Sequence, residues 1–535
     1  MSENLKQQIA IFIRRVAENE VIRFIERKSI IPDHARHNTL DFNQPTMPLP
    51  HTMLLFTWIA LMLTALPEAA AQTPSRPNVL LICVDDLKPT IGCFGDPIAK
   101  TPNIDALARR GVRFQSAYCN QAVCSPSRNA LMTGLRPQSI GIYDLATHFR
   151  KSVPDVTTFS QYFIEHGYSA EGLGKIYHVG HGNIDDKRSW SKPSWRPRTP
   201  SYVLESSRNN IVADKQGRMR GPATEAADVP DETYADGAIA EEAIKRLKSL
   251  SDAKQQPFFL AVGFVKPHLP FVAPQRYWDL YDADALPMPK THEPPKEAPS
   301  YAPTNFGELR NYSDMPGKGS IDEATTRRLI HGYYAATSYM DAQLGRVIAQ
   351  ADSLGLLDNT IVVLWGDHGW HLGDHGMWCK HTNYEQAARI PVVVVAPNGD
   401  HGKASDALIE TVDIFPTVAQ LAGLPIPQQI DGRSFANVVK NPMAEARPYA
   451  THVYPRGERI GRAIRDGRYR MIEWKVPGKP SASAEIELYD YQEDPNETLN
   501  QAGRQPDVVK AMRERLNEHP EAKKQYRATA VSRTR

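Results

Sequence analysis

The sequence predicts an α/β protein with a large, mixed but mostly parallel sheet between helices, followed by a small C-terminal subdomain with an antiparallel sheet. The first observation is that short apolar runs alternate with helical patterns from Pro77 onward, which is typical of a doubly wound sheet. The second is a change of pattern after about residue 446. The third is size, because 535 residues with 41% apolar content can bury a large core.

Four apolar runs are the strand candidates. They cover 78–84, 257–265, 360–366 and 390–397. Because they are apolar on both faces, they are typical of parallel strands buried between two helix layers. The covering helices are expected at 102–111, 235–250, 322–355 and 411–423.

The end of the chain has a different character. The stretches 462–476 and 486–497 look like antiparallel strands. Earlier, the Pro-rich polar stretches 183–200 and 285–303 read as long surface excursions of the kind that border a binding site. We therefore divide the chain into an N-terminal extension (1–71), a main domain (72–445) and a C-terminal subdomain (446–535).

The N-terminal extension contains an uncharged apolar run, within 53–75, that is followed by three alanines at 69–71. This pattern is typical of a secretory signal peptide, and the run is too short to span a bilayer comfortably. We expect an exported protein, periplasmic or secreted, whose mature chain begins near Gln72 and has no stable membrane span. Since a signal peptide should begin a chain, Met47 or Met53 is the expected start. The alternative is a buried or membrane-anchoring helix behind a genuine extension.

The charge balance and the cysteines exclude several classes of protein. Lys plus Arg total 63 and Asp plus Glu total 61, without a long run of one sign, which argues against nucleic-acid or membrane-surface binding. The five cysteines show no CxxC spacing and are too few for a disulfide framework. A zinc site built from thiolates is also not expected.

Polar side chains follow three of the four predicted strands, and two more follow another short run near residue 173. The clusters are Asp85-Asp86, Lys175 with His178, Lys266 with His268, and Asp367-His368. Taken singly, such residues cap helices, form turns or face solvent. Ligands of open α/β sheets bind at the carboxyl ends of the strands, so we expect these clusters to converge on one crevice. Three carboxylates there would repel one another unless a cation such as calcium or magnesium neutralised them.

Cys124, in the stretch 121-QAVCSPSRNALMTGLRP-137, precedes Pro126, which reads as the first residue of a helix. Its side chain would then lie at the positive end of that helix, where anions bind. Four interpretations are open: half of a disulfide, a buried apolar side chain, a thiolate nucleophile, or the precursor of another group. A thiolate phosphatase typically has its arginine about five residues on and needs no metal cluster, whereas Arg128 is closer.

The C-x-P-x-R pattern with 133-TG-134 resembles the sequence at which type I sulfatases have a cysteine oxidised to formylglycine. The resemblance extends over most of the chain, through 84–96, 101–114, 174–178, 264–271, 366–385, 412–425 and 488–502. Within the family it is most similar to the iduronate-2-sulfatase branch, notably in Tyr143-Asp144, KPHLPF and GDHGWHLG.

The resemblance implies an alkaline-phosphatase-like fold and a complete metal site. It makes Cys124 the precursor of a formylglycine, produced by a separate maturation enzyme. The implied metal ligands are Asp85, Asp86, Asp367, His368 and the modified Cys124. Calcium is the expected ion, ahead of magnesium, although a histidine nitrogen is a less natural ligand for calcium than for softer ions.

The resemblance also implies a mechanism of sulfate ester hydrolysis. One hydroxyl of the hydrated aldehyde attacks sulfur, while Arg128 and Lys175 hold the negative charge. His268 or Lys380 donates a proton to the leaving oxygen, and we favour His268, with Lys380 orienting the sulfate. His178 then takes the second hydroxyl proton and expels sulfate.

The expected substrate is a sulfated saccharide, with a uronate carboxylate that Arg456, Arg459 or Lys266 could bind. Two other functions stay open. One is a phosphonate or phosphodiester hydrolase of the same superfamily, which relative rates on the two ester types would separate. The other is a binding protein with a decayed active site.

Overall fold

The computed structural model describes residues 76–527, except 215–216 and 254–255. The predicted N-terminal extension, with its signal peptide, the cleavage near Gln72 and the starts at Met47 or Met53, lies outside the described residues. Within those residues, no helix combines the length and the apolar character that crossing a membrane requires.

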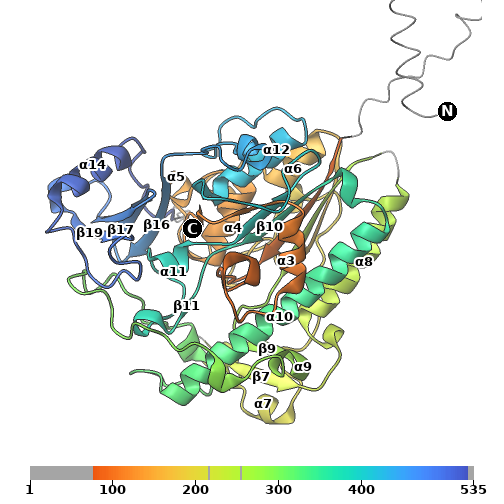
Figure 1. Cartoon of the computed structure of the whole chain (residues 1–535), viewed down its shortest axis with the longest axis horizontal. Coiled ribbons are helices and arrows are strands. Elements are labelled where there is room, and N and C mark those ends of the chain that lie inside the picture. Colours follow the sequence, from red (N-terminus) through yellow and green to blue (C-terminus); the bar gives the residue numbers. More distant parts are fainter. Residues whose placement is uncertain (1–75, 215–216, 254–255, 528–535) are drawn as a thin grey trace, which may run out of the picture. The chain divides into compact units, whose positions relative to one another are not determined.

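The main sheet has seven strands in the order β14-β2-β13-β10-β1-β8-β4. Its strands are β1 (Asn78–Val84), β2 (Val112–Phe114), β4 (Ser169–Gly174), β8 (Phe258–Phe264), β10 (Thr360–Gly366), β13 (Val392–Val395) and β14 (Lys403–Ser405). The central strand β1 is parallel to both β10 and β8, and β4 is parallel to β8. The predicted mixed, mostly parallel sheet is therefore confirmed (Figure 1).

Strand β13 differs from the sequence interpretation of the run 390–397. It is antiparallel to β10 and to β2, although its four valines are as buried as the residues of the parallel strands. Burial on both faces selects apolar residues whatever the strand direction, so composition alone does not reveal direction.

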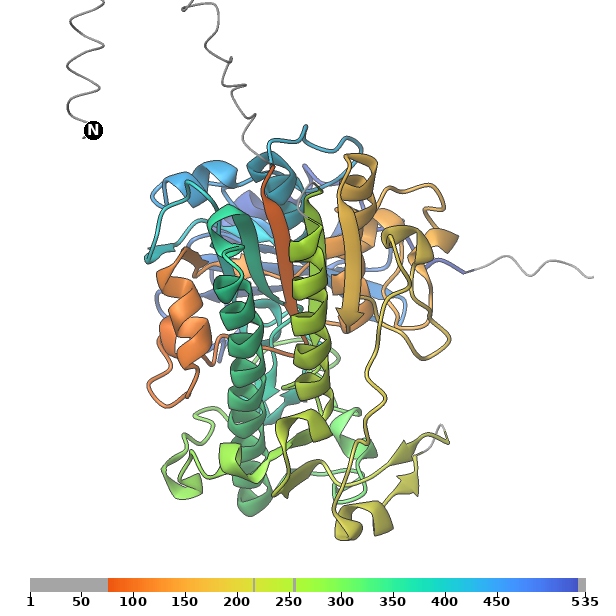
Figure 2. The same cartoon turned by 90° about the vertical axis from the view of Figure 1, so that its right-hand side faces the viewer.

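Two helix layers cover the sheet, and alternate residues of β1 face each layer. Leu80, Ile82 and Val84 pack with α3 (Pro102–Arg109), α8 (Ala235–Asp252) and α10 (Glu323–Ser353). Val79, Leu81 and Cys83 pack with α4 (Cys124–Thr133), α6 (Phe159–Glu165) and α12 (Ile414–Leu421). Figure 2 shows α8 and α10 lying side by side across their face of the sheet. The four predicted helices are all present, and the third and fourth stretches end at glycines with left-handed φ angles of 65° (Gly355) and 72° (Gly423).

Shorter elements connect these layers. The strands are β3 (Ala117–Tyr118), β5 (Val212–Ala213), β6 (Met219–Arg220), β7 (Thr224–Ala227), β9 (Phe271–Pro274), β11 (His371–Leu372), β12 (Trp378–Cys379) and β15 (Ile409–Glu410). The helices are α5 (Pro137–Ile140), α7 (Glu205–Asn209), α9 (Gln275–Trp278), α11 (Glu385–Ala388) and α13 (Ala436–Lys440).

The C-terminal sheet is antiparallel throughout, as predicted. It consists of β16 (Ala450–Arg456), β17 (Arg459–Arg465), β18 (Tyr469–Lys475) and β19 (Glu485–Asp490), in that order. The predicted stretch 462–476 covers the second half of β17, a turn and β18. Helix α14 (Pro506–Leu516) packs on one face of this sheet, and Tyr384 of the main domain packs near Ile472 on the other.

The end of the described chain lies against the segment that follows α4. The Lys523 backbone N–H donates to the Gln138 carbonyl at 3.1 Å, and the Tyr526 N–H donates to the Gly141 carbonyl at 2.6 Å. The Tyr143 hydroxyl donates to the Lys523 carbonyl at 2.6 Å. These bonds connect positions about 380 residues apart in the sequence.

Candidate active site

The predicted polar clusters meet at the carboxyl ends of the parallel strands. Asp85 and Asp86 follow β1, Asp367 and His368 follow β10, and Lys175 follows β4. Asp367 Oδ1 accepts hydrogen bonds from the backbone N–H groups of Asp86 at 2.9 Å and His368 at 3.0 Å. Asp86 has a left-handed φ of 59°, a conformation that costs free energy in a non-glycine residue. The strand ends are therefore connected through the carboxylates themselves.

Arg128 lies between two of these carboxylates. Its Nε contacts Asp367 Oδ2 and its guanidinium NH2 contacts Asp85 Oδ1, both at 3.0 Å, and its side chain is fully buried. The Lys175 ammonium contacts the other oxygen of Asp85. Burial alone would raise the pKa of Asp85, but Lys175, His268 and Arg128 hold it well below its usual value.

Cys124 is the first residue of α4, so Pro126 is the third helical residue and not the first, as the sequence suggested. Proline is tolerated there because the first four N–H groups of a helix have no intrahelical partner. The sulfur lies 3.4 Å from His368 Nε2 and 3.9 Å from Asp86 Oδ1. The Ser127 hydroxyl donates to the Asp367 carbonyl at 2.5 Å, which fixes α4 against β10. Cys124 has no disulfide among the described residues.

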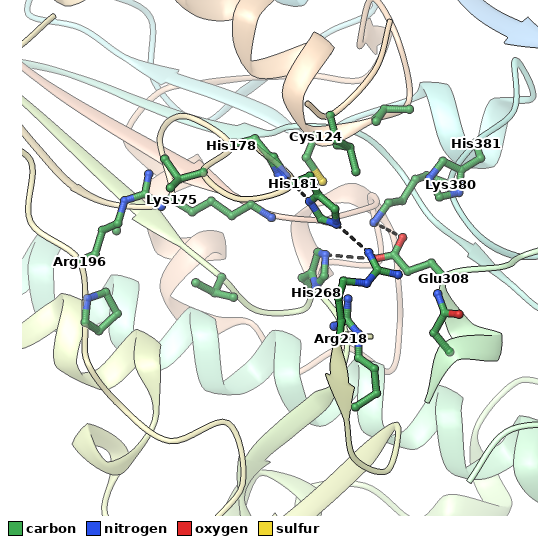
Figure 3. Close-up of a pocket in the computed structure, with 18 residues that line it drawn as sticks. Cys124, Lys175, His178, His181, Arg196, Arg218, His268, Glu308, Lys380 and His381 are labelled. Carbon is green, nitrogen blue, oxygen red and sulfur yellow. Dashed lines mark hydrogen bonds and ion pairs between the residues drawn. The ribbon is translucent and has the colours of Figure 1, made fainter. Parts of the chain in front are cut away.

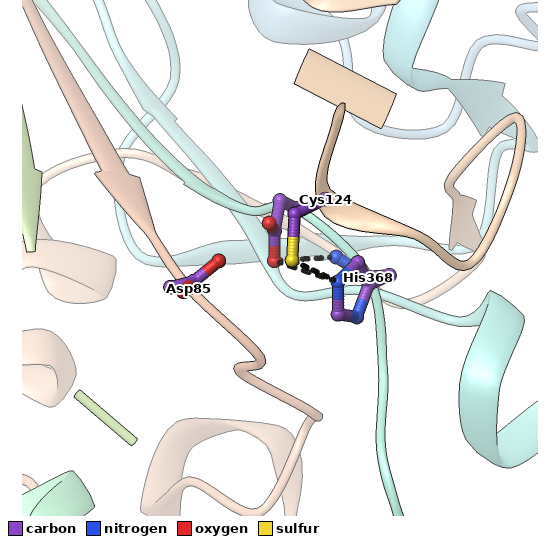
Figure 4. A group of neighbouring side chains, drawn as sticks. Asp85, Cys124 and His368 are labelled. Atoms are coloured by element: carbon purple, nitrogen blue, oxygen red, sulfur yellow. Dashed lines mark hydrogen bonds and ion pairs between the residues drawn. The ribbon is translucent and has the colours of Figure 1, made fainter. Parts of the chain in front are cut away.

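The arrangement fits a divalent cation. One ligand atom from each of Asp85, Cys124, Asp367 and His368 lies within 4.8 Å of the others, and all four residues are buried (Figure 4). Burial raises the pKa of the Asp86 carboxyl. Burial also raises the pKa of Asp367, to about 7, although the nearby charges of His368 and Arg128 act to lower it. Buried carboxylates that resist ionisation are stabilised by a cation, and oxygen-rich donor sets suit calcium or magnesium.

His268 and Lys380 also lie close to the carboxylates of the cluster. His268 Nε2 lies 3.9 Å from Asp86 Oδ2, and Lys380 Nζ lies 3.1 Å from the same oxygen. Both also contact Glu308, whose carboxylate lies 3.1 Å from His268 Nε2 and 2.7 Å from Lys380 Nζ (Figure 3). Burial would raise the pKa of Glu308, but Lys380 and His268 hold it well below its usual value. Sequence reasoning missed Glu308, because it follows the 285–303 excursion without any motif.

Comparison with known proteins identifies the family. The sulfatase family model matches residues 77–424, and the model of the C-terminal region of N-sulphoglucosamine sulphohydrolase matches residues 373–522. The chain belongs to the sulfatase family. It is accordingly a sulfuric ester hydrolase, and the predicted resemblance is confirmed. Iduronate 2-sulfatase of Mus musculus is 35% identical over 405 residues, which are 69% of this chain and 73% of that protein.

Solved structures agree on the fold. A protein solved in complex with its substrate D-glucosamine-2-N,6-O-disulfate has a TM-score of 0.66 at 23% identity, covering 83% of this sulfatase and 97% of that chain. The phosphonate monoester hydrolase of Silicibacter pomeroyi has a TM-score of 0.67 at 21% identity, covering 83% and 95%. The predicted alkaline-phosphatase-like, sulfatase-type fold is therefore confirmed, while such low identities leave the reaction to be argued from the site.

The cavity above Cys124 has a volume of about 580 Å³ and includes His178 in its wall. His178 Nε2 lies 3.0 Å from His181 Nδ1, and His181 Nε2 lies 2.8 Å from the Arg218 guanidinium. A guanidinium only donates, and burial together with His178 and Arg218 lowers the pKa of His181. A neutral His181 therefore accepts from Arg218 and donates to His178, which places the hydrogen of a neutral His178 on Nδ1.

Loops complete the outer wall of this cavity. Arg196 comes from the predicted excursion 183–200, which borders the site as expected. Arg218 and Arg220 come from the hairpin of β5 and β6, which sequence reasoning missed because its strands are two residues long. A second cavity of about 420 Å³, with Tyr301 and Pro303 of the 285–303 stretch in its wall, shares Glu308 and His381 with the first.

The three residues that the sequence suggested for binding a substrate carboxylate, Arg456, Lys266 and Arg459, do not line the main cavity. Arg456 donates to the carbonyls of Tyr301, Ala302, Pro303 and His381 and serves to hold these loops. Lys266 is buried and donates to the carbonyls of His268 and Pro270, at 2.7 and 2.6 Å. Arg459 lies 3.6 Å from Glu485 and over the ring of Tyr301. The arginines in the wall of the main cavity are Arg196, Arg218 and Arg220 instead.

Proposed function

We propose that this sulfatase removes sulfate from a sulfated, uronate-containing saccharide in the manner of an iduronate-2-sulfatase, through a formylglycine made from Cys124 and one bound divalent metal. The observation that carries the proposal is the position of Cys124. It begins a buried helix, follows the C-x-P-x-R pattern, and lies beside three buried carboxylates and a histidine. The similarity to iduronate 2-sulfatase supports the substrate class.

The metal ligands are Asp85, Asp86, Asp367, His368 and the modified Cys124, and calcium suits their oxygen-rich set better than magnesium, which demands a stricter geometry. The ion supplies positive charge that balances the carboxylates and polarises the sulfate. Arg128 holds Asp85 and Asp367 in place through its two 3.0 Å contacts. The Lys175 ammonium, which contacts Asp85, binds a sulfate oxygen of the substrate.

A hydrated aldehyde at position 124 supplies an oxygen nucleophile for sulfur and a second hydroxyl through which sulfate leaves. His268 donates the proton to the leaving sugar oxygen, and Lys380 orients the sulfate. Glu308 contacts both side chains and helps to hold them in place. His178 takes the proton of the second hydroxyl, which requires its hydrogen-bond chain to His181 and Arg218 to break or reverse.

The partners follow from this chemistry. They are the saccharide and a maturation enzyme that oxidises Cys124, with no nucleic acid. The apolar run and the alanines at 69–71 support export to the periplasm or the exterior.

A phosphonate or phosphodiester hydrolase is the second candidate. It is favoured by the structural likeness to phosphonate monoester hydrolase, at a TM-score of 0.67. We rank this candidate second because the sequence identity to iduronate 2-sulfatase, 35%, is higher than the 21% to the phosphonate monoester hydrolase.

The decisive experiment joins mass spectrometry of the Cys124 peptide to a screen of esters. A peptide that carries formylglycine, with faster turnover of a sulfated oligosaccharide than of matched phosphonate and phosphodiester esters, is the expected result. An unmodified cysteine in enzyme that is fully active would overturn the formylglycine proposal. A preference for the phosphorus esters would favour the second candidate.

A further inference from the structure

A second cavity adjoins the one above Cys124. It has a volume of about 420 Å³, which is within the range of small-molecule sites, roughly 300 to 1,000 Å³. The walls of the two cavities share Glu308 and His381. Figure 3 shows both residues on the same side as Lys380 and across the first cavity from Arg196. The chemistry proposed at sulfur leaves the second cavity unused.

His381 is held between the two cavities by its backbone. Its φ of 73° is left-handed, as is the φ of 71° at Cys379, so both residues around Lys380 adopt a conformation that costs free energy outside glycine. The His381 N–H donates to the Ala122 carbonyl at 3.3 Å, and the His381 carbonyl accepts from Arg456 at 2.5 Å. Strained residues that the surrounding contacts hold in this way cluster at ligand sites.

The His381 ring keeps its hydrogen-bonding capacity for a ligand. Within the described part of the chain the ring forms no hydrogen bond, and it contacts Tyr454 edge-on with ring centres 6.2 Å apart. Burial and the Lys380 ammonium lower the pKa of His381 to about 3, so the ring is neutral near pH 7. A neutral imidazole has one donor and one acceptor nitrogen, which suits the hydroxyl groups of a sugar better than an anion.

The charged groups of the second cavity already have partners. The Arg456 guanidinium is bonded to carbonyls of the surrounding loops, and the Glu308 carboxylate is shared by His268 and Lys380. The other polar side chains of this wall are uncharged, namely Tyr301, Thr304 and Asn305. An uncharged group rich in hydroxyls therefore fits this wall better than a second anion does.

We infer that the second cavity binds an uncharged sugar unit attached to the sulfated one, and that His381 hydrogen-bonds its hydroxyl groups where the two cavities meet. This inference rests on the proposed function and adds a second unit to its substrate. The sulfated unit occupies the first cavity, whose wall contains Cys124, Lys175 and Lys380. The substrate is then at least a disaccharide with one charged and one uncharged unit.

The test compares three compounds on the metal-loaded enzyme. The first is a sulfated uronate as its methyl glycoside, the second is the same unit linked to an uncharged hexose, and the third is that unit linked to a hexose with a carboxylate. The wild type should have the highest kcat/KM for the second compound. Its advantage over the first should be roughly 10-fold, mainly through KM, which is the range of one or two neutral hydrogen bonds. A higher value for the third compound than for the second would overturn the inference.

Three variants separate the His381 ring from its strained backbone. His381→Ala and His381→Gly both remove the ring, and glycine alone adopts a left-handed φ without strain. Both should lose the preference for the second compound over the first, while the unfolding midpoint of His381→Gly should be at or above that of His381→Ala. His381→Asn should retain part of the preference, because asparagine tolerates this φ and keeps a donor and an acceptor. Gln429→Gly is the control, since Gln429 is exposed, has a φ of 63° and lies outside both cavity walls.

Gly307→Leu tests the second cavity itself. Gly307 is in the wall of the second cavity but not of the first. Among the described residues beyond its chain neighbours, a β-carbon at this position meets only the Asn305 side chain, at 3.4 Å. The leucine side chain should occupy part of the second cavity and lower kcat/KM more for the second compound than for the first. Equal effects on the two compounds would contradict a sugar in this cavity.

Equal kcat/KM values of the wild type for the first two compounds would overturn the inference. So would a preference that is lost in His381→Ala and fully kept in His381→Gly, because the backbone and not the ring would then be responsible. An enzyme that hydrolyses an aryl sulfate but none of the three saccharides would refute the proposed function instead. The inference is then judged by titrating the Cys124→Ala protein with the first two compounds, and equal affinities would overturn it.

Discussion

Two buried clusters of acidic residues differ in how their charges are balanced. The site cluster is Asp85, Asp86 and Asp367. The second cluster is Glu410 and Asp413, and Glu410 contacts both Arg136 and the Thr451 backbone at the start of β16. Both are fully buried and both contact arginines.

Every carboxylate oxygen of the second cluster is bound by the protein. Glu410 Oε2 accepts from Arg136 at 2.8 Å and from Asn120 at 2.7 Å, while its Oε1 accepts from Arg447 and the Thr451 backbone. Asp413 contacts Arg447 and accepts from the Arg433 and Glu410 backbones. Its partners are arginines, an amide and the main chain, which are permanent donors.

The site cluster is balanced by a different set of groups. Its partners include Lys175, Lys380, His268 and His368 beside Cys124, and several of these line an open cavity. Lysine and histidine exchange partners and protons more readily than arginine does. The comparison teaches that buried charge alone does not mark an active site, whereas buried charge with exchangeable partners beside a cavity does.

The largest expected effect is the loss of activity when Cys124, the proposed nucleophile, is replaced, compared with replacement of a buried cysteine outside the site. Cys124→Ala should lower kcat for any sulfate ester by at least roughly 10³-fold, because the nucleophile is lost. The thermal unfolding midpoint should stay close to that of the wild type. Cys119→Ala is the matched control, since Cys119 is also buried but its thiol donates to the Ala387 backbone carbonyl and not to a group of the site cluster. Activity of Cys124→Ala above a few per cent would refute the nucleophile assignment.

The next effect concerns His268 and Lys380, the two residues that contact Glu308, and tests which of them protonates the leaving group. His268→Ala should reduce turnover of a sugar sulfate more than that of an aryl sulfate, by a factor on the order of 10² to 10⁴, because a sugar alkoxide needs protonation and a phenolate does not. Lys380→Ala should reduce both about equally. Steady-state kinetics on the two substrates measures this, and the reverse pattern would assign the proton donor to Lys380.

The second cluster should respond in stability and not in catalysis. Glu410→Gln leaves Arg136 without its buried carboxylate partner and leaves Arg447 with Asp413 alone, which should lower the free energy of unfolding by about 3 kcal/mol or more. The kcat of folded enzyme should be unchanged. Urea unfolding with parallel assays measures both, and a specific loss of kcat would contradict a structural role.

Metal removal should affect the site cluster alone. Dialysis against a chelator should abolish activity and lower the unfolding midpoint by several degrees, because the three carboxylates lose their cation. Added calcium should restore both. In an Asp86→Asn variant the midpoint should depend less on calcium than in the wild type. If the wild-type midpoint is the same with and without the ion, the metal site is refuted.

The smallest expected effect is a change with pH in the stability that Glu410 of the second cluster contributes to the fold. Burial would raise the pKa of Glu410, but Arg136 and Arg447 lower it to about 2, from a usual value near 4.5. A depressed pKa in the folded state stabilises the fold above the unfolded pKa, and this contribution is lost as pH falls from about 4.5 to 2. The stability difference between wild type and Glu410→Gln should therefore shrink over that window. A constant difference from pH 7 to pH 3 would contradict it.

The sequence predicted the inner site better than its surroundings. Asp85, Asp86, Asp367 and Lys175 were found because strand ends place them at one edge of the sheet, whatever the loops do. Glu308 and the hairpin of Arg218 and Arg220 were missed, since loop conformation depends on contacts distant in the chain. Roles of the predicted residues stay predictions, as do the domain boundaries at 71 and 445.

Two errors have local physical causes. Strand β13 has the composition of a parallel strand because both its faces are buried, and direction leaves no mark on composition. Helix α4 begins at Cys124 and not at Pro126, because proline fits any of the first positions of a helix and marks its start only approximately.

The contacts between residues 523–526 and the segment after α4 have a consequence for the order of synthesis. The ribosome releases Cys124 long before it releases Lys523, and about 380 residues separate the partners of this contact. The hydrogen bonds to Gln138, Gly141 and Tyr143 therefore cannot form until residues 523–526 have left the ribosome. The segment that directly follows the helix of Cys124 is therefore synthesised early but receives these neighbours late.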